Sequence, residues 1–307
     1  MPRIDLLTVG EAFQDLIFVG LPHMPRSGEE LRTQRFVATI GGGAVITATA
    51  ASRLGLRTAI VSALSRDAAL ALRRDRVRVV NLKRPEEGHA VTVSLSTKRD
   101  RGFVTFEGVN DRLEARLPAA IACQHARHVH LAFAPRNCAR WVRIVARLRA
   151  LGVTTSWDFG WNPALRAAAG FSALVGAADF VFVNEAEATM YARVRQTAAA
   201  VAFWRGTSRN TIIKLGRRGS RWIAGGQAAM DVASPAPRVR VVDTTGAGDA
   251  FNGGFLVGWL GRQPPRECLR LGNFVGAQST TAPGGVARLP SSVPGKSVGA
   301  GRPGGSR

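Results

Sequence analysis

The sequence predicts an α/β fold in which helices flank a mostly parallel central sheet, with a smaller sheet beside it. Short apolar runs rich in β-branched residues alternate with helix-length segments, which is typical of a parallel sheet covered on both faces. Four other runs alternate polar and apolar residues, as half-buried strands do. A chain of 307 residues with 46% hydrophobic residues is long enough to form one large core with a small appendage.

The expected elements can be placed in chain order. The small sheet is expected from residues 12–20, 31–40, 89–97 and 101–108. Strands of the large sheet are expected at 4–9, 58–63, 128–133, 153–157, 180–183 and 211–215. Helices are expected at 44–54, 138–151, 185–203 and 249–261. Residues 1–290 would then form one domain, followed by a Gly-, Ser- and Pro-rich segment, 291–307, that is expected to be a disordered tail.

The composition argues against several classes of protein. The net charge is +21, but arginines scattered through the chain, rather than a basic patch with interleaved aromatic residues, supply most of it, so nucleic acid is not an expected partner. No run of 18 apolar residues predicts a membrane span, and the N-terminus lacks the layout of a signal peptide. Three widely spaced cysteines favour a reducing, cytoplasmic location over a disulfide framework.

The most informative stretch is DTTGAGDAF, residues 243–251. It follows the apolar run 239–242, expected to be a strand, and precedes an apolar helix. A glycine turn at a helix start directs free backbone N–H groups at one point, where they bind phosphate or a developing oxyanion. Asp249 stands beside that point and is a candidate general base for a hydroxyl that attacks phosphorus. The N–H groups of Gly246, Ala247 and Gly248 are the candidate anion hole.

This stretch resembles the second signature, D-T-x-G-A-G-D, of the ribokinase-like (PfkB) carbohydrate kinases, and the resemblance covers about residues 4–290. It implies a Rossmann-like core with a small β-sheet lid. It also implies an ATP-dependent kinase that phosphorylates a hydroxymethyl group of a small sugar or sugar acid. The expected cofactors are ATP and Mg²⁺, with K⁺ as a candidate, and the lid edges are a candidate homodimer interface.

The resemblance also implies which residues bind the sugar. Three glycines, Gly41, Gly42 and Gly43, precede an apolar helix and are similar to the first signature of the family. Asp15, an acid within an apolar strand, and Asn110, after the lid strands, are the other candidates. The sequence departs from the family at Ile46, where an Asn usually contacts substrate hydroxyls. An apolar side chain cannot make that hydrogen bond.

A second departure follows Val61. The family carries a glycine-containing segment, then a helix and a strand, before the chain returns to the lid. The segment here is short and lacks those glycines, with Asp67 as a candidate remnant of the motif. We therefore expect a truncated wall on one side of the sugar pocket.

The resemblance implies a nucleotide site and two cation sites. Glu187, in an N-x-x-E motif, is expected to hold Mg²⁺ through water, although the same motif also caps a helix. Asp243 and Thr245 are the candidate K⁺ ligands. The expected nucleotide-binding residues are Asn184, Lys214, Gly216, Gly219, Gly246, Gly248 and Asn273.

Two alternatives to a sugar kinase stay open. The same fold serves nucleoside kinases, and Ile46 favours a less polar substrate pocket. The departures at Ile46 and after Val61 also fit a catalytically degenerate protein that binds sugar or nucleotide and regulates another process. The intact Asp249 and glycine turn favour catalysis.

Overall fold

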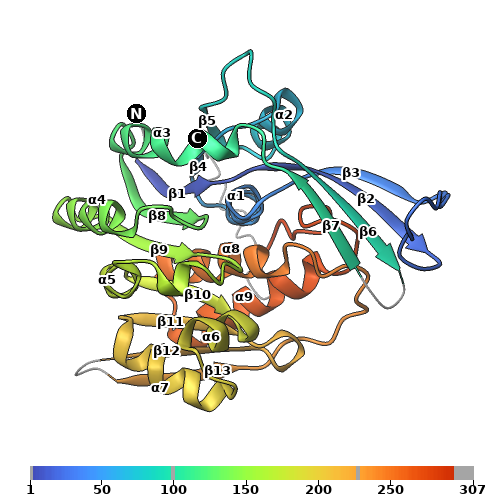
Figure 1. Cartoon of the computed structure of the whole chain (residues 1–307). Coiled ribbons are helices and arrows are strands. Elements are labelled where there is room, and N and C mark those ends of the chain that lie inside the picture. Colours follow the sequence, from blue (N-terminus) through green and yellow to red (C-terminus); the bar gives the residue numbers. More distant parts are fainter. Residues whose placement is uncertain (1–2, 98–100, 226–228, 294–307) are drawn as a thin grey trace, which may run out of the picture.

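The computed structural model describes residues 3–97, 101–225 and 229–293, which form two sheets with helices around the larger one (Figure 1). The large sheet comprises β1 (Ile4–Gly10), β4 (Thr58–Ser62), β5 (Arg78–Asn81), β8 (Ala126–Ala132), β9 (Thr154–Asp158), β10 (Phe180–Asn184), β11 (Asn210–Lys214), β12 (Ser220–Ala224) and β13 (Met230–Ser234). Its strand order is β13-β12-β11-β10-β9-β8-β1-β4-β5. The pairs from β11 to β5 are parallel, and β12 and β13 add antiparallel pairs at one edge.

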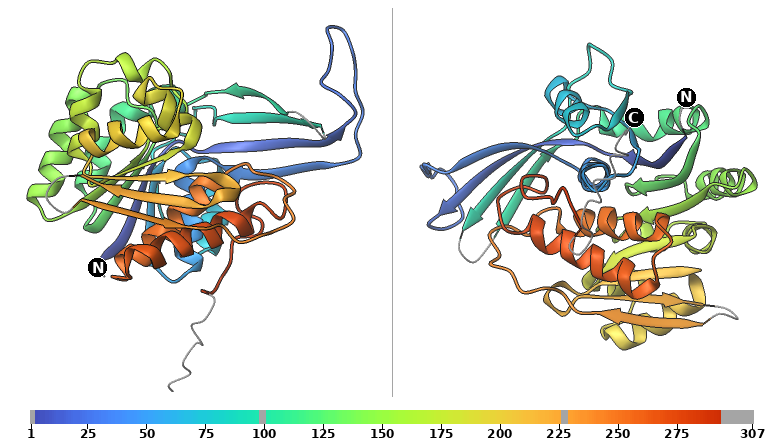
Figure 2. Two further views of the ribbon diagram at one scale, coloured as in Figure 1. Left: turned by 90° about the horizontal axis from the view of Figure 1, so that it is seen from below. Right: turned by 180° about the vertical axis from the view of Figure 1, so that it is seen from behind.

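Helices cover both faces of the large sheet. One face carries α3 (Asn110–Ala122), α4 (Cys138–Ala150), α5 (Phe171–Ala177), α6 (Glu185–Ala192) and α7 (Thr197–Thr207). The other carries α1 (Gly43–Arg53), α2 (Arg66–Arg74), α8 (Ala247–Leu260) and α9 (Pro265–Ser279), as the second panel of Figure 2 shows. This arrangement brings the N-termini of α1 and α8 together near the carboxyl end of β1.

The strands are buried on both faces because helices pack on each side. All seven residues of β1 are buried. Leu7 and Val9 point into the core beneath α3 and α4, which includes Trp141, whereas Leu6 packs with Phe255 of α8 on the opposite face. This double burial explains why the strands read as continuous apolar runs rather than as alternating ones.

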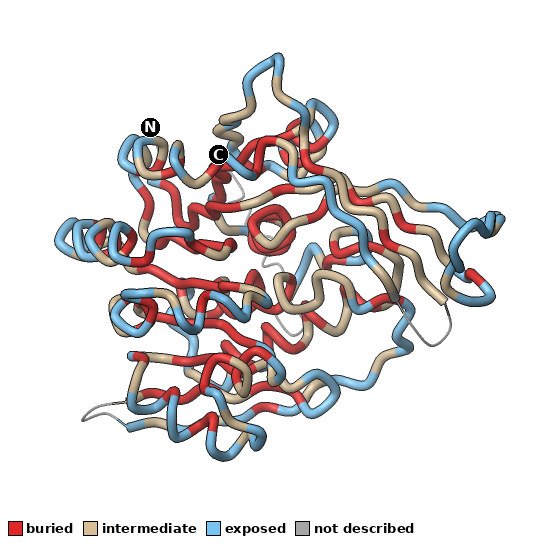
Figure 3. Tube along the Cα trace, in the orientation of Figure 1, coloured by how far each residue is buried: buried red, intermediate tan, exposed pale blue. Residues whose placement is uncertain are grey.

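The small sheet, the lid, consists of β2 (Phe13–Leu21), β3 (Phe36–Gly41), β6 (Val91–Thr97) and β7 (Arg101–Phe106) in the order β3-β2-β6-β7. It extends from the core as an arm (Figure 2). β1 runs almost directly into β2, and β3 runs directly into α1. The lid is largely solvent-exposed toward its tip, whereas its base is buried (Figure 3). The lid connects to the core between β1 and β2 and between β3 and α1. These two connections place Asp15 and Gly41–Gly43 at the junction of lid and core.

The structure corrects several expectations. Residues 31–35 are not a strand, so β3 begins only at Phe36. The segment 185–203 is two helices, because Arg193 adopts a left-handed conformation (φ 55°) that ends α6. The short segment after Val61 still contains a helix and a strand, α2 and β5. The run 239–242 is not a strand.

Other expectations are met or fall outside the described residues. The expected helices at 44–54, 138–151 and 249–261 correspond closely to α1, α4 and α8. Residues 294–307 of the expected tail lie outside the described part of the chain. Among the described helices, none combines the length and apolar character needed to cross a bilayer.

Candidate active site

The glycine turn before α8 has the geometry that its sequence predicts. Gly246 adopts a left-handed conformation (φ 72°), which a residue with a side chain rarely takes, and it begins the helix that carries Asp249 in its first turn. The N–H of Ala247 donates to Thr244 O (3.2 Å), whereas the N–H of Gly248 meets no acceptor within the described residues. The peptide N–H of Gly248, at the positive end of the helix, is therefore available to an anion.

Instead of strand pairing, hydrogen bonds to α9 hold the segment before this turn. The N–H groups of Val242 and Asp243 both donate to Thr280 O, at 2.7 and 3.1 Å. The carboxylate of Asp243 accepts from the N–H of Thr245 (2.8 Å) and from that of Gly284 (2.9 Å). Asp243 thus ties the glycine turn to the loop that follows α9.

Asp249 sits against the start of α1. A Cβ atom on Gly43 would lie 2.9 Å from Asp249 Oδ1 and 3.0 Å from Ala132 Cβ, so only glycine leaves room there. Thr47 Oγ1 donates to Asp249 O (3.0 Å) and joins the two helices. Burial, reinforced by the nearby Asp158 carboxylate, raises the pKa of Asp249 to about 7. A carboxyl with that pKa can accept a proton near neutral pH.

A second carboxyl meets the other end of the glycine run, from the lid side. Asp15 of β2 is buried, and a Cβ on Gly41 would collide with its carboxylate. Burial, with a smaller contribution from Asp243, raises the pKa of Asp15 to about 7. Gly42, with φ 98°, lies against the backbone of Glu11. Asp15 therefore lies against Gly41 at one end of the glycine run, and Asp249 lies against Gly43 at the other.

Ile46 is buried and does not face the proposed substrate site. Its side chain is only 2% exposed and packs between Gly246 and Gly285. A Cβ on Gly285 would lie 2.5 Å from Ile46 Cδ1. Ile46 therefore supports the glycine turn from behind with an apolar contact.

A buried polar triad, which the sequence did not reveal as a unit, lies beneath the turn. Lys214 Nζ donates to Asp158 Oδ2 (2.7 Å), and Asn252 Nδ2 donates to the same oxygen (2.8 Å). A Cβ on Gly248 would stand 3.0 Å from Lys214 Nζ, so the ammonium group lies next to the turn. The opposing charge of Asp158 raises the pKa of Lys214 against the effect of burial. Lys214 was expected at the nucleotide site, and Asn252 is an amide within the largely apolar helix α8, but no local pattern joined either residue to Asp158.

Asn184 and Glu187 form a capping box at the start of α6. The N–H of Glu187 donates to Asn184 Oδ1 (2.9 Å), and the N–H of Asn184 donates to Glu187 Oε2 (2.8 Å). Burial, followed by repulsion from Asp158, raises the pKa of Glu187. Glu187 therefore lies within electrostatic reach of the triad, at the carboxyl ends of β9, β10 and β11.

The remaining predicted nucleotide residues border β11 and α9. Gly216 and Gly219 form the turn between β11 and β12, closed by a hydrogen bond from the N–H of Leu215 to Gly219 O (2.7 Å). Asn273 of α9 is buried and donates through Nδ2 to Ser234 O (2.9 Å). It links α9 to the end of β13.

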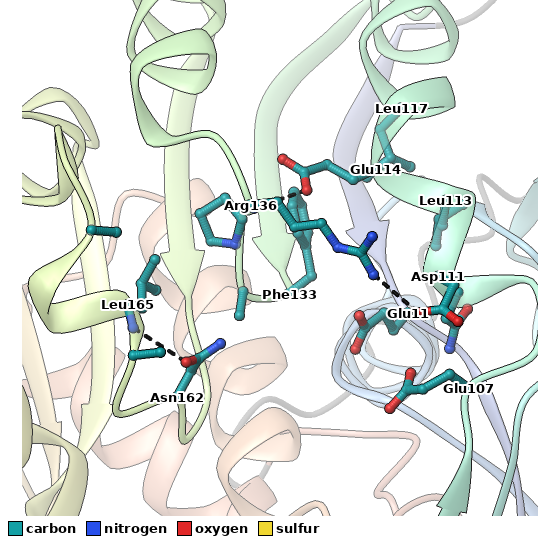
Figure 4. Close-up of a pocket in the computed structure, with 15 residues that line it drawn as sticks. Glu11, Glu107, Asp111, Leu113, Glu114, Leu117, Phe133, Arg136, Asn162 and Leu165 are labelled. Atoms are coloured by element: carbon teal, nitrogen blue, oxygen red, sulfur yellow. Dashed lines mark hydrogen bonds and ion pairs between the residues drawn. The ribbon is translucent and has the colours of Figure 1, made fainter.

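Asn110 begins α3 and lines a cavity of about 480 Å³ between that helix and the loop after β8. Its Nδ2 donates to Ala12 O (3.2 Å), which joins α3 to the start of the lid. The cavity also contains Glu11 and Glu107, so acidic side chains line one end of it (Figure 4). Of the residues that line this cavity, the sequence predicted a functional role only for Asn110.

The profile described as "pfkB family carbohydrate kinase" matches residues 3–292. The chain belongs to the pfkB family of carbohydrate kinases. The expected family is thereby confirmed, and this pfkB protein is an ATP-dependent kinase of the sugar and nucleoside kinase group.

Named relatives and solved structures agree with this assignment. The pfkB protein is 33% identical to acarbose 7(IV)-phosphotransferase of Actinoplanes sp. over 75% of its own chain and 76% of the relative. It is 26% identical to ribokinase of Haemophilus influenzae over 94% and 96% of the two chains.

Among solved structures, adenosine kinase from Sinorhizobium meliloti matches with a TM-score of 0.79 at 21% identity, covering 94% of this chain and 98% of that one. Arabidopsis thaliana ribokinase, solved with ribose and ATP, matches with a TM-score of 0.73 at 22% identity, covering 94% and 96%. These structures confirm the ribokinase-like fold.

Proposed function

We propose that this pfkB protein transfers the γ-phosphoryl group of ATP to a hydroxymethyl group of a small sugar or sugar acid, with Asp249 as the general base. The observation that carries the proposal is the position of Asp249. It lies in the first turn of α8, beside the available N–H of Gly248 and against Gly43, and its pKa is raised to about 7. A proton acceptor and an anion site are thus next to each other.

In the proposed reaction, the sugar binds between lid and core against Asp15, Gly42 and Gly43. Asp249 takes the proton of the hydroxymethyl group as its oxygen attacks the γ-phosphorus. The new O–P bond forms as the bond from that phosphorus to the ADP oxygen breaks. The N–H of Gly248 and the ammonium group of Lys214 stabilise negative charge on the transferring group.

The residues around Glu187 fit a divalent cation site. Its carboxylate is buried beside Asp158, and one oxygen already holds the capping box, so a contact through water is the more suitable arrangement. Mg²⁺ bound there supplies positive charge to the phosphates of ATP. K⁺ is proposed on fewer observations than Mg²⁺. The Asp243 carboxylate orders the backbone around Thr245, and the backbone carbonyl oxygens there would serve as K⁺ ligands.

The test compares Asp249→Asn with the matched variant Asp67→Asn. Asp67 also lies in the first turn of a helix, α2, but is exposed. ADP release would be measured with Mg·ATP and K⁺ across pentoses, hexoses, 2-keto-3-deoxy sugar acids and nucleosides.

We expect Asp249→Asn to lower turnover by about 10²–10⁴-fold. ATP binding, measured by calorimetry, should remain, and Asp67→Asn should retain activity. Full activity in Asp249→Asn would refute the general-base role. Turnover only with nucleosides would establish the alternative substrate class, and binding of ATP without turnover of any compound would favour a regulatory protein.

A further inference from the structure

The cavity between α3 and the loop after β8, termed here the α3 cavity, adjoins the proposed sugar site. Glu11 belongs to this cavity, and its backbone packs against Gly42. On the other side, Ala132 contacts Gly43, and the next residue, Phe133, lines the cavity. The α3 cavity and the proposed sugar site are therefore neighbours, because Glu11 and Phe133 line the first while Glu11 and Ala132 border the glycines of the second.

The α3 cavity is acidic although the whole chain carries a net charge of +21. Four carboxylates line it, and Arg136 is its one basic lining residue among the described residues. Figure 4 shows Glu11, Glu107 and Asp111 gathered at one end. Their repulsion adds to burial in raising the pKa of Glu11 to about 7. An excess of acid of this kind favours a positively charged ligand group.

The protein itself neutralises only part of this acidity. Glu114 accepts hydrogen bonds from Trp141 Nε1 (2.8 Å) and from the N–H of Arg136 (2.9 Å). Asp111 accepts from Arg136 Nη2 (3.0 Å). No ion pair or hydrogen bond engages the side chains of Glu11 and Glu107 among the described residues, so these two carboxylates face the cavity without a cation.

Asn110 gives independent support for a ligand that donates hydrogen bonds. Its side chain is buried, with only 6% of the residue exposed, and it lines the same cavity. The bond from Nδ2 to Ala12 O fixes the orientation of the amide, because a carbonyl can only accept. Asn110 Oδ1 then has no partner within the described residues. A buried acceptor without a hydrogen-bond partner is unfavourable, so a donor group is expected beside Asn110 Oδ1.

We propose that the substrate is an amine-bearing sugar or oligosaccharide, whose protonated amine occupies the α3 cavity while its hydroxymethyl group faces Asp249. This inference rests on the proposed kinase function and specifies its substrate class. An ammonium group supplies both positive charge for Glu11 and Glu107 and N–H donors for Asn110 Oδ1. A volume of about 480 Å³ lies within the range of small-molecule sites.

The arrangement of the acids argues against a bare metal ion in this place. Among the described ranges, no three His, Cys, Asp or Glu side chains are close enough together to hold a metal. The carboxylates at this end of the cavity are instead placed to face a larger organic cation.

The test uses three disaccharides with the same β-1,4 linkage: the glucosamine disaccharide, its N,N′-diacetylated form and cellobiose. Dissociation constants would be measured by calorimetry, and ADP release in parallel. We expect the glucosamine disaccharide to bind about tenfold more tightly than the other two, because a charge-assisted hydrogen bond is stronger than a neutral one.

Two variants should change this preference in opposite directions. Glu107→Gln removes an exposed carboxylate and should weaken binding of the amine severalfold. Arg136→Gln removes the internal cation and should strengthen it. Glu267→Gln, an exposed acid of α9 outside the cavity, is the matched control and should have no effect.

The outcomes separate this inference from the proposed function. Equal affinity for the three disaccharides, or an amine preference unchanged in Glu107→Gln and Arg136→Gln, would overturn the inference, even if neutral sugars are phosphorylated. A strong amine preference without ADP release from any sugar would support the inference about binding and refute the kinase mechanism.

Discussion

At the scale of single residues, the site depends on carboxyls kept from full ionisation by burial. Asp249 lies against Gly43 and Asp15 against Gly41, and burial is the main cause that raises the pKa of each to about 7. Each carboxyl can therefore change its protonation near neutral pH. A group that titrates there can accept a proton and return it within one catalytic cycle.

The raised pKa of Asp249 predicts how activity depends on pH. The general base must be ionised, so kcat/KM should fall about tenfold for each pH unit below 7 and level off above it. The measurement is a pH profile of initial rates between pH 5 and pH 9. A rate that is flat across pH 5 to 7 would contradict the base role or its raised pKa.

Gly43 predicts a steric effect on catalysis. In Gly43→Ala the new methyl group would lie 2.9 Å from Asp249 Oδ1, so the carboxylate must move. A shift of this size should lower kcat by about 10²-fold. Gly206→Ala is the control, because that position within α7 has nothing within 4 Å and should tolerate the methyl group. Unchanged kinetics in Gly43→Ala would mean that Asp249 is not held at this distance during turnover.

At the scale of elements, α6 combines a helix cap with a proposed cation site, and two variants separate these roles. Asn184→Ala removes half of the capping box and should cost about 0.5–2 kcal/mol in the free energy of unfolding. Glu187→Gln keeps an acceptor for the N–H of Asn184 but removes the charge. We expect it to unfold near the wild-type temperature while requiring much more Mg²⁺ for half-maximal activity. An unaltered Mg²⁺ requirement would leave Glu187 only its capping role.

The sequence predicted elements best where local chemistry marks their ends. Gly43 and Asn137 stand at or next to the first residues of α1 and α4, and both helices lie within a residue or two of expectation. The break at Arg193 was missed because a left-handed arginine has no sequence signature. The run 239–242 reads as a strand, but the N–H of Val242 bonds to Thr280 O, a partner that only tertiary structure supplies.

The candidate site shows the same contrast between residues that belong to local motifs and residues that only the tertiary structure brings together. Asp249, Gly246 and Gly43 belong to contiguous motifs, so the sequence predicts them directly. The triad of Asp158, Lys214 and Asn252 joins segments that are 56 and 94 residues from Asp158 in the chain, and no local pattern links them. The α3 cavity was missed for the same reason, since Glu11 and Glu107 approach each other only after the lid has folded.

At the scale of the whole molecule, the lid has an edge that a second copy could cover. β7 is an edge strand of the lid, and Val104 and Phe106 on it are 68% and 62% exposed. Apolar residues on an unpaired edge favour strand pairing between chains. We therefore retain the homodimer through the lid as a proposal.

A charge on that edge tests the proposal. Val104→Lys should shift the protein from dimer to monomer, because a lysine on an edge strand opposes edge-to-edge pairing. Sedimentation velocity over a range of concentrations measures the change, and Leu151→Lys, at another exposed apolar position, is the control. A wild-type protein that is monomeric at all concentrations, or a dimer unaffected by Val104→Lys, would rule out this interface.

The tryptophans behind the α3 cavity give the molecule an optical reporter. Trp141 and Trp157 are fully buried, with ring centroids 5.3 Å apart, and their indole N–H groups donate to Glu114 and to Phe133 O, both on residues of the cavity wall. Indole emission responds to the electric field of neighbouring carboxylates. A cation entering the cavity would change that field, so unlabelled protein should signal occupancy through its intrinsic fluorescence, before any phosphate is transferred.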